Sequence, residues 1–393
     1  MSKSIHKSIT NKKQKGIRIL SVGTDRSIFE SASDTQKRIK KQAELVDEMH
    51  IVVFSLRSHN LKEEMIGDNI YLYPTHSWSR WLYIFDGWWR GRKVAGRMNK
   101  RNLLITSQDA FETGIVAYLV SRYADSPFQL QIHTDFMSPA FVANNRLNCL
   151  RVAVARFLVP KAAGIRVVSE RIARSIFEFF GRETEAKLSV LPVYVDMEKY
   201  TREAGESREM YPQFDTLLLV VARLEREKNV AMAIEALDKI VDVYPKTGLV
   251  IVGDGREKES LEQYVHNLGL DHNVKFEGAQ HDVMPYYKSA DIFLNTSDYE
   301  GYGRTLLEAA AAGCPIVTTN VGIVGDILVP ERHVLACDLY DVDCVIESVK
   351  RIMADRAFGE ALSAKAKDSA AKSFIKNENE YFSRFRDLWM ECL

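Results

Sequence analysis

The stretch DIFLNTSDYEGYGRTLLEAAAAGCPIVTTN, residues 291–320, decides the fold class. Its two apolar runs, IFLNTS and PIVTTN, flank a helix predicted around Arg304–Ala312. Continuous apolar strands that alternate with amphipathic helices indicate a parallel sheet covered on both faces. This part of the chain is therefore predicted to be a wound α/β unit.

The same alternation continues on both sides of this stretch. It begins at a strand TLLLVVA (Thr216–Ala222) and includes strands GLVIVGDG and NVKFEG. Helices are predicted at Val230–Tyr244, Glu257–Leu268, 342–355 and 358–375.

An earlier series of the same kind starts at the strand IRILSV (Ile17–Val22). Further apolar strands lie near residues 52, 72, 104, 130, 167 and 190. Helices are predicted at Asp34–Met49, Phe111–Tyr123, Asn145–Val159 and Glu170–Phe179. Two α/β series in one chain indicate two Rossmann-like domains.

A chain of 393 residues also exceeds what one hydrophobic core usually serves. We expect domains at 1–195 and 196–376, with a flexible tail at 1–16 and a polar linker from Asp196 that contains Pro212. The aromatic C-terminal helix, 377–393, is expected to pack back on the first domain. Ligands of parallel sheets bind at the carboxyl ends of the strands, so the site is expected in an interdomain cleft.

The composition excludes several classes of protein. The formal net charge is zero, with 53 basic and 53 acidic residues, which argues against a nucleic-acid partner. Five scattered cysteines without a CxxC pair are interpreted as reduced thiols. The N-terminus has no apolar signal segment, and no apolar run reaches the length of a membrane span. We therefore expect a cytoplasmic protein.

The loop in residues 297–303 has the chemistry of a nucleotide site. Gly301 and Gly303 let backbone approach a ligand, and the start of the following helix offers free N–H groups to a phosphate. Glu308 is placed to bind ribose hydroxyls, and Glu300 to meet a sugar hydroxyl. A surface loop with a capped helix is the simpler alternative for a lone motif of this kind.

The segment from Glu300 to Pro315 is not alone, and it resembles the signature of the family 4 retaining glycosyltransferases, which have the GT-B fold. A second similar element is ARLEREKN, residues 222–229. Arg223 and Lys228 would there compensate the charge of a departing diphosphate. The resemblance covers nearly the whole chain and is densest between Arg223 and Pro315.

The resemblance implies roles for residues on both domains. His133, at a strand end, would act near the donor sugar together with Arg223, Lys228 and Glu300. Residues implied in donor binding are Gly301, Tyr302, Gly303, Arg304, Thr305, Glu308, Gly278 and Val283. Ser169 is interpreted as a structural helix cap.

Two departures from the family pattern concern the first domain and the hinge. The loop after the first strand has one glycine, Gly23, where the family usually has a pair, so Asp25 or Arg26 is a candidate for acceptor or phosphate contact. PVYVD replaces PNGVD at residues 192–196 and leaves the hinge geometry open.

The resemblance implies a retaining hexosyltransferase that needs no cofactor and uses a UDP- or GDP-sugar. No Asp-x-Asp motif, ligand cluster or P-loop indicates a metal. We expect front-face displacement through an oxocarbenium-like state, and a glycan or lipid-linked acceptor of cell-envelope or glycolipid synthesis. A non-catalytic sugar-nucleotide-binding subunit and a GT-B sugar-nucleotide epimerase remain alternatives.

One local patch combines aromatic and basic residues. It contains four of the five tryptophans, in a stretch whose only acid is Asp86. Indoles beside cations are typical of a bilayer interface over anionic lipid, while core tryptophans with solvated cations are the alternative. The candidate contacts of the inner membrane face are Trp78, Trp81, Trp88, Trp89, Arg90, Arg92 and Lys93.

Overall fold

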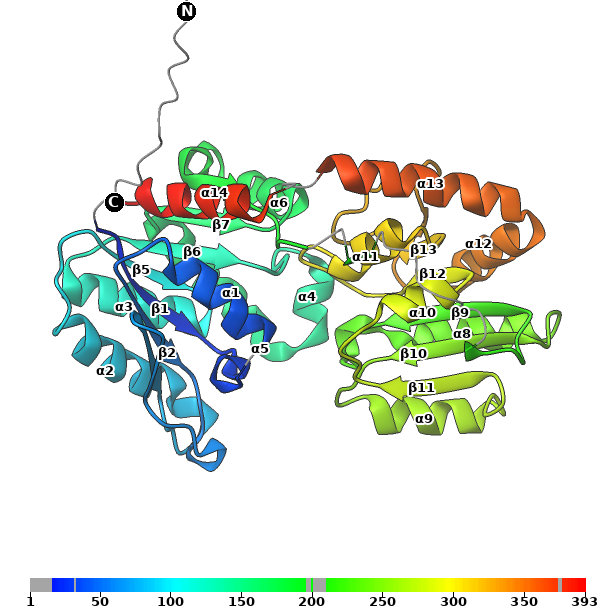
Figure 1. The fold of residues 1–393 in the computed structure, drawn as a ribbon, viewed down its shortest axis with the longest axis horizontal. Coiled ribbons are helices and arrows are strands. Elements are labelled where there is room, and N and C mark those ends of the chain that lie inside the picture. The colour runs from blue at the N-terminus through cyan, green and yellow to red at the C-terminus, as the bar shows by residue number, and fades with distance from the viewer. Residues whose placement is uncertain (1–15, 32, 196–198, 201–209, 374–376) are drawn as a thin grey trace, which may run out of the picture. The chain divides into compact units, whose positions relative to one another are not determined.

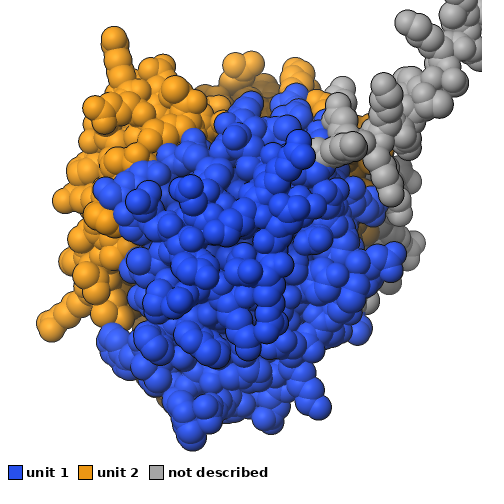
Figure 2. All heavy atoms as spheres, turned by 90° about the vertical axis from the view of Figure 1, so that its left-hand side faces the viewer, with its two compact units in different colours: residues 1–131, 161–164, 382–393 blue, residues 132–160, 165–381 orange. Residues whose placement is uncertain are grey.

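The computed structural model describes residues 16–31, 33–195, 199–200, 210–373 and 377–393. The expected N-terminal tail, apart from Gly16, lies outside these residues, and so does most of the expected linker from Asp196. The chain divides into two compact units, which are coloured separately in Figure 2. Unit 1 comprises residues 1–131, 161–164 and 382–393, and unit 2 comprises residues 132–160 and 165–381.

The first sheet has eight strands in the order β3-β4-β2-β1-β5-β6-β7-β8. Their bounds are β1 Arg18–Gly23, β2 Glu48–Val53, β3 Glu64–Ile66, β4 Ile70–Pro74, β5 Leu103–Ser107, β6 Phe128–Ile132, β7 Gly164–Val167 and β8 Leu188–Val190. The short edge strand β3 pairs antiparallel with β4, whereas β1 pairs parallel with both β2 and β5. Strands β2 and β5 are buried almost throughout, as expected for a sheet covered on both faces.

The helices of this part of the chain follow its strands (Figure 1). They are α1 Asp34–Ala43, α2 Tyr83–Ala95, α3 Glu112–Ala124, α4 Pro139–Asn144, α5 Arg146–Leu158 and α6 Glu170–Phe180. Ser169 caps α6 as predicted, because its hydroxyl accepts a hydrogen bond from the Ile172 N–H at 3.3 Å.

The second sheet has six strands in the order β11-β10-β9-β12-β13-β14, and its pairs are parallel. The strands are β9 Thr216–Val221, β10 Thr247–Val252, β11 Val274–Gly278, β12 Ile292–Asn295, β13 Ile316–Thr319 and β14 Leu335–Cys337. The helices are α8 Val230–Val241, α9 Lys258–Asn267, α10 Met284–Ser289, α11 Arg304–Ala312, α12 Val342–Ala354, α13 Arg356–Ser373 and α14 Glu378–Met390.

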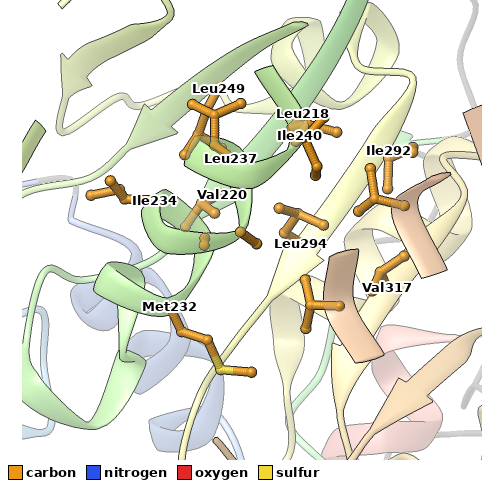
Figure 3. Packing of buried hydrophobic residues seen from close by; sticks show 14 of the residues in the cluster. Leu218, Val220, Met232, Ile234, Leu237, Ile240, Leu249, Ile292, Leu294 and Val317 are labelled. Atoms are coloured by element: carbon orange, nitrogen blue, oxygen red, sulfur yellow. The ribbon is translucent and has the colours of Figure 1, made fainter. Parts of the chain in front are cut away.

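A continuous apolar core fixes the second sheet against its helices. Figure 3 shows Leu218 and Val220 of β9 packed beside Leu237 and Ile240 of α8. Burial of each such side chain contributes about 1.5–3 kcal/mol. The carboxyl edge of the sheet, where the predicted site loops begin, is thus supported by a packed apolar core.

Within unit 1, the aromatic face of the C-terminal helix is buried. Phe385 and Trp389 of α14 are almost fully enclosed, and Gln129 of β6 donates a hydrogen bond to the Leu388 carbonyl at 3.0 Å. The aromatic spacing in this helix therefore covers apolar surface, as such a pattern requires.

The predicted helix Asp34–Met49 is wrong in its second half. Helix α1 ends at Ala43, and β2 begins at Glu48. The residues from Met49 onward are buried between neighbouring strands, with Met49 paired to Ile19 of β1. Tertiary burial in a central strand overrides the local helical spacing.

The interpretation of all five cysteines as reduced thiols is also wrong. Cys337 and Cys344 form a disulfide with a Cα–Cα distance of 5.7 Å. Cys337 ends β14, and Asp341 caps α12 by accepting from the Cys344 N–H, so the strand-to-helix turn brings the two sulfurs together. The spacing shows no CxxC, which is why sequence reasoning missed the pair.

Candidate functional site

Two loops meet at the carboxyl edge of the second sheet because β9 and β12 are neighbours. One loop follows β9 and leads to α8, and the other follows β12 and leads to α11. Asn229 joins them, since its carbonyl accepts from Thr296 Oγ1 at 2.9 Å and its amide donates to Asp298 Oδ1 at 3.1 Å. The Asp298 N–H also donates to the Glu227 carbonyl. The two predicted motifs therefore form one site.

An ion pair lies at the centre of these loops. Lys228 Nζ is 2.5 Å from Glu300 Oε1, and both side chains are largely buried, at 14% and 13% exposure. The Ser297 hydroxyl lies 2.9 Å from the same carboxylate oxygen. Two residues predicted to be catalytic, from separate motifs, are thus in direct contact.

The Glu300 loop also contacts residues of the 132–160 and 165–195 segments, which belong to the same unit 2. A β-carbon on Gly301 would lie 1.7 Å from the carbonyl oxygen of His133, so only glycine fits. The Gly301 carbonyl accepts a hydrogen bond from Ser169 Oγ at 2.8 Å. The backbone of His133 is therefore brought to the loop that carries Glu300.

Helix α11 begins at this loop. Gly303 is its N-cap residue and adopts φ +84°, a left-handed conformation that favours glycine. The amides of Arg304 and Thr305 lie in the first turn, where free N–H groups favour an anion. The preceding side chain, Tyr302, is buried and belongs to the core rather than to an open surface.

Glu308 lies inside the protein, at 4% exposure, with its carboxylate fully engaged. Oε1 accepts from Tyr200 at 2.8 Å and from Arg304 Nε at 2.7 Å. Oε2 accepts from Tyr287 at 3.1 Å. Burial and the adjacent carboxylate raise the pKa of both tyrosines, which keeps them protonated donors.

The remaining predicted donor residues lie on neighbouring elements. Gly278 ends β11 with φ +69°, and Val283 precedes α10, the helix that carries Tyr287. Arg223 is largely exposed and pairs with Glu227 at 3.2 Å. Arg223 is thus not part of the buried Lys228–Glu300 pair.

The loop after β1 contains the residues predicted to contact acceptor or phosphate. Asp25 caps the short helix Arg26–Phe29 and accepts hydrogen bonds from Ser27 and Thr35. Burial opposes ionisation of Asp25, but these hydrogen bonds outweigh it and lower its pKa. Gly23 is buried against the Gln108 side chain, whereas Arg26 is exposed.

Burial raises the pKa of Asp109, after β5, to about 6. An unfolded aspartate titrates near 4, so stability is expected to fall as pH rises from about 4 to about 6. Asp109→Asn keeps an acceptor for the Phe111 N–H and should stabilise the protein at pH 7 by about 1–2 kcal/mol, less than the full shift implies because the residue is partly exposed. Urea unfolding at pH 4.5 and pH 7 measures this gain, and an equal gain at both values would contradict the assignment.

The predicted membrane residues lie on the short helix Arg80–Leu82 and on α2, except for Trp78, which precedes both helices. Trp78 and Trp81 are 75% and 83% exposed, and Trp89 is 53% exposed. Trp88 is half-buried, and Arg90 is paired with Glu63. The patch therefore presents most of its indoles to solvent.

Sequence reasoning missed the residues that hold the predicted ones in place. These are Tyr200 and Tyr287, which bind Glu308, together with Ser297 and Asn229. For Asn229 the residue type itself was a signal, because asparagine is enriched in the left-handed conformation that Asn229 adopts, with φ +45°. Tyr200 carried none, since it reaches Glu308 from 108 residues away.

The fold and this carboxyl-edge site define a GT-B architecture, and solved structures confirm the predicted pair of parallel-sheet α/β domains. The structure of Anabaena Alr3699/HepE in complex with UDP-glucose superimposes with a TM-score of 0.74 at 18% identity, covering 96% of this chain and 100% of that chain. Sucrose-phosphate synthase (tll1590) from Thermosynechococcus elongatus gives 0.78 at 17% identity, covering 96% and 99%.

Sequence comparisons match glycosyltransferases. Residues 207–369, under half of the chain, match the family model of glycosyl transferases group 1. An uncharacterized glycosyltransferase, MJ1059 of Methanocaldococcus jannaschii, is 24% identical over 70% of each chain. The alpha-monoglucosyldiacylglycerol synthase of Streptococcus pneumoniae is 24% identical over 71% of this chain and 66% of its own, and glycogen synthase of Mycobacterium tuberculosis is 29% identical over 66% and 62%.

Two features of the described residues bear on metals and membranes. They contain no group of three or more His, Cys, Asp or Glu side chains arranged to hold a metal ion. No helix within the described ranges has both the length and the apolar character needed to cross a bilayer.

Proposed function

We propose that this chain is a retaining, metal-independent glycosyltransferase that moves a hexose-type sugar from a nucleotide diphosphate sugar to a glycan or lipid-linked acceptor. The observation that carries the proposal is the buried Lys228–Glu300 pair beside the N-terminus of α11. Residues 196–376 would bind the donor, and residues 1–195 would serve the acceptor.

UDP is the proposed nucleotide of the donor. Three solved structures that share the fold contain UDP or UDP-glucose. The diphosphate would bind at the first turn of α11 and Lys228, because amide N–H groups and a largely buried cation both favour phosphate oxygens. Glu308 would take the ribose hydroxyls after Tyr200 leaves its carboxylate.

The chemistry follows from charge that develops on the leaving diphosphate. Lys228 is fixed in place by Glu300 and needs no reorganisation as that charge grows. Glu300 is already hydrogen-bonded by Lys228 and Ser297, so it suits a sugar hydroxyl better than covalent attack. We therefore favour front-face displacement with retention, in which the diphosphate itself accepts the acceptor proton.

We also propose that the enzyme works at an anionic membrane surface on the inner face of the membrane. The exposed indoles Trp78, Trp81 and Trp89 lie on α2 or just before it, and Lys93 Nζ lies 5.5 Å from the centre of the Trp89 ring. A glycolipid synthase among the relatives is consistent with a lipid-linked acceptor. Aromatic and basic residues together supply both parts of interfacial binding.

A thermal-shift series with UDP, GDP and ADP tests the donor site. Saturating UDP at about 100 times Kd should add about 2.7 kcal/mol of stability to the wild type. Glu308→Gln should weaken UDP because one carboxylate acceptor is lost. Tyr200→Phe is the matched control, and it should tighten UDP by about fivefold, since one competing hydrogen bond of about 1 kcal/mol is removed.

The same samples separate the alternatives. Incubation with UDP-hexose and an acceptor should release UDP and form a glycoside, whereas an epimerase would interconvert UDP-sugars without releasing UDP. UDP binding without turnover would establish the non-catalytic subunit. The absence of any shift with the three nucleotides would overturn the donor site.

A further inference from the structure

A hollow of about 390 Å³ lies at the C-terminal end of α2 in unit 1. Its volume falls within the roughly 300–1,000 Å³ of small-molecule sites. Helices α2 and α3 lie side by side and form its walls (Figure 1). The lining residues are Trp89, Arg92, Lys93, Gly96, Arg97 and Tyr123.

Three of the six lining residues are cations, and none is an acid. Within the described residues, no carboxylate lies within salt-bridge distance of Arg92, Lys93 or Arg97, whereas nearby Arg90 has Glu63 as its partner. A helix C-terminus carries only about half a negative charge. The hollow therefore keeps an excess of positive charge that an anion can neutralise.

Aromatic rings hold two of these cations in place. The Arg92 guanidinium lies 4.9 Å from the centre of the Tyr123 ring, and Lys93 Nζ lies 5.5 Å from that of Trp89. Such contacts are worth about 0.5–1 kcal/mol at exposed sites and limit side-chain freedom. The cations are thus arranged before any ligand arrives, which lowers the entropy cost of binding.

Exposed apolar side chains continue from the hollow along α2. Phe85, Trp89 and Lys93 follow one another at intervals of four and share one helix face, which changes from apolar to basic toward the hollow. Phe85 is 61% exposed, and Trp81 precedes the helix. A free phosphate would contact only the cations and would leave the exposed apolar side chains of this row in water. An apolar phase beside the hollow would cover them.

We propose that this hollow binds the phosphate headgroup of an anionic phospholipid while Trp81 and Phe85 enter the acyl boundary. The inference rests on the membrane contact of the proposed function and adds to it a defined headgroup site. Arg92, Lys93 and Arg97 donate hydrogen bonds to the phosphate, and Trp89 and Tyr123 line its sides. The site is therefore selective for anionic over neutral lipid.

Co-sedimentation of the full chain with vesicles tests the site. The probes are phosphatidylcholine vesicles with and without phosphatidylglycerol. The wild type should bind only the anionic vesicles strongly. Arg92→Gln/Lys93→Gln/Arg97→Gln should bind them about 100-fold more weakly, at about fivefold for each cation lost. Arg97→Gln alone, which disturbs no ring contact, should bind about fivefold more weakly.

The matched control changes charge equally in unit 2. Lys275→Gln/Arg332→Gln/Lys365→Gln removes three exposed cations and should keep wild-type binding, because none of these side chains lines the hollow. Equal losses in the two triple variants, wild-type binding by the α2 variant, or equal binding of the wild type to neutral vesicles would each overturn the site.

Vesicle binding needs no nucleotide, so the test stands apart from the donor site. UDP-dependent thermal shifts should be unchanged in both triple variants, and circular dichroism checks their folding. Loss of UDP binding in the wild type with intact vesicle selectivity would remove the donor proposal and leave the headgroup site standing.

Discussion

Lys228→Met is expected to lower kcat by about 10²–10³-fold while the protein still binds donor. The lysine is largely buried at 2.5 Å from Glu300, so its charge acts on the leaving diphosphate with little screening. Removal of one such preorganised group from a transition state costs about 3–4 kcal/mol. Single-turnover rates with UDP-hexose and acceptor measure the loss.

The same substitution also carries a cost in stability, because it leaves Glu300 buried without its partner. Breaking a buried pair by removing one side costs about 3–5 kcal/mol, whereas removing both charges costs much less. The double variant Lys228→Met/Glu300→Gln should therefore regain most of the stability in urea unfolding. It should not regain activity. Recovery of turnover in the double variant would show that the pair is only structural.

The helices and strands around the site were largely predictable from sequence. Helix α11 has the predicted bounds Arg304–Ala312, and β9 begins at Thr216 as expected. Ser169 caps α6 for the predicted reason. These features depend on local periodicity and capping chemistry, which involve only residues close together in the sequence.

The partners inside the site were not predictable in the same way. Tyr200, Tyr287 and Arg304 all converge on Glu308, and only Arg304 is its neighbour in sequence. The Cys337–Cys344 disulfide likewise depends on where β14 ends and α12 begins. Contacts of this kind arise from tertiary packing, so a single sequence carries no period or motif for them.

The Glu300 loop supplies the second large expected effect. Gly301→Ala should destabilise the protein by about 3 kcal/mol or more, because the new β-carbon would lie 1.7 Å from the His133 carbonyl oxygen. The β-carbon is bonded directly to the backbone of residue 301, and the oxygen belongs to the backbone of His133, so neither can rotate away. A shift of Gly301 would also strain its hydrogen bond from Ser169.

Gly313→Ala is the matched control at the other end of α11. Gly313 adopts φ +78° with no atom within 4 Å of a built β-carbon, so its alanine variant should cost only about 1–2 kcal/mol of left-handed strain. Gly301 has no such positive φ, and its cost is purely steric. Thermal unfolding of the two variants compares the mechanisms directly, and equal losses would contradict the close approach to His133.

Activity should separate the two glycine variants further. A displacement of about 1 Å in a positioning loop can lower turnover about 100-fold. Gly301→Ala moves the loop that holds Glu300 against Lys228, whereas Gly313→Ala leaves it in place. If Gly301→Ala lost stability but kept full turnover, Glu300 would not need its present position, and the assignment of the Lys228–Glu300 pair to catalysis would fail with it.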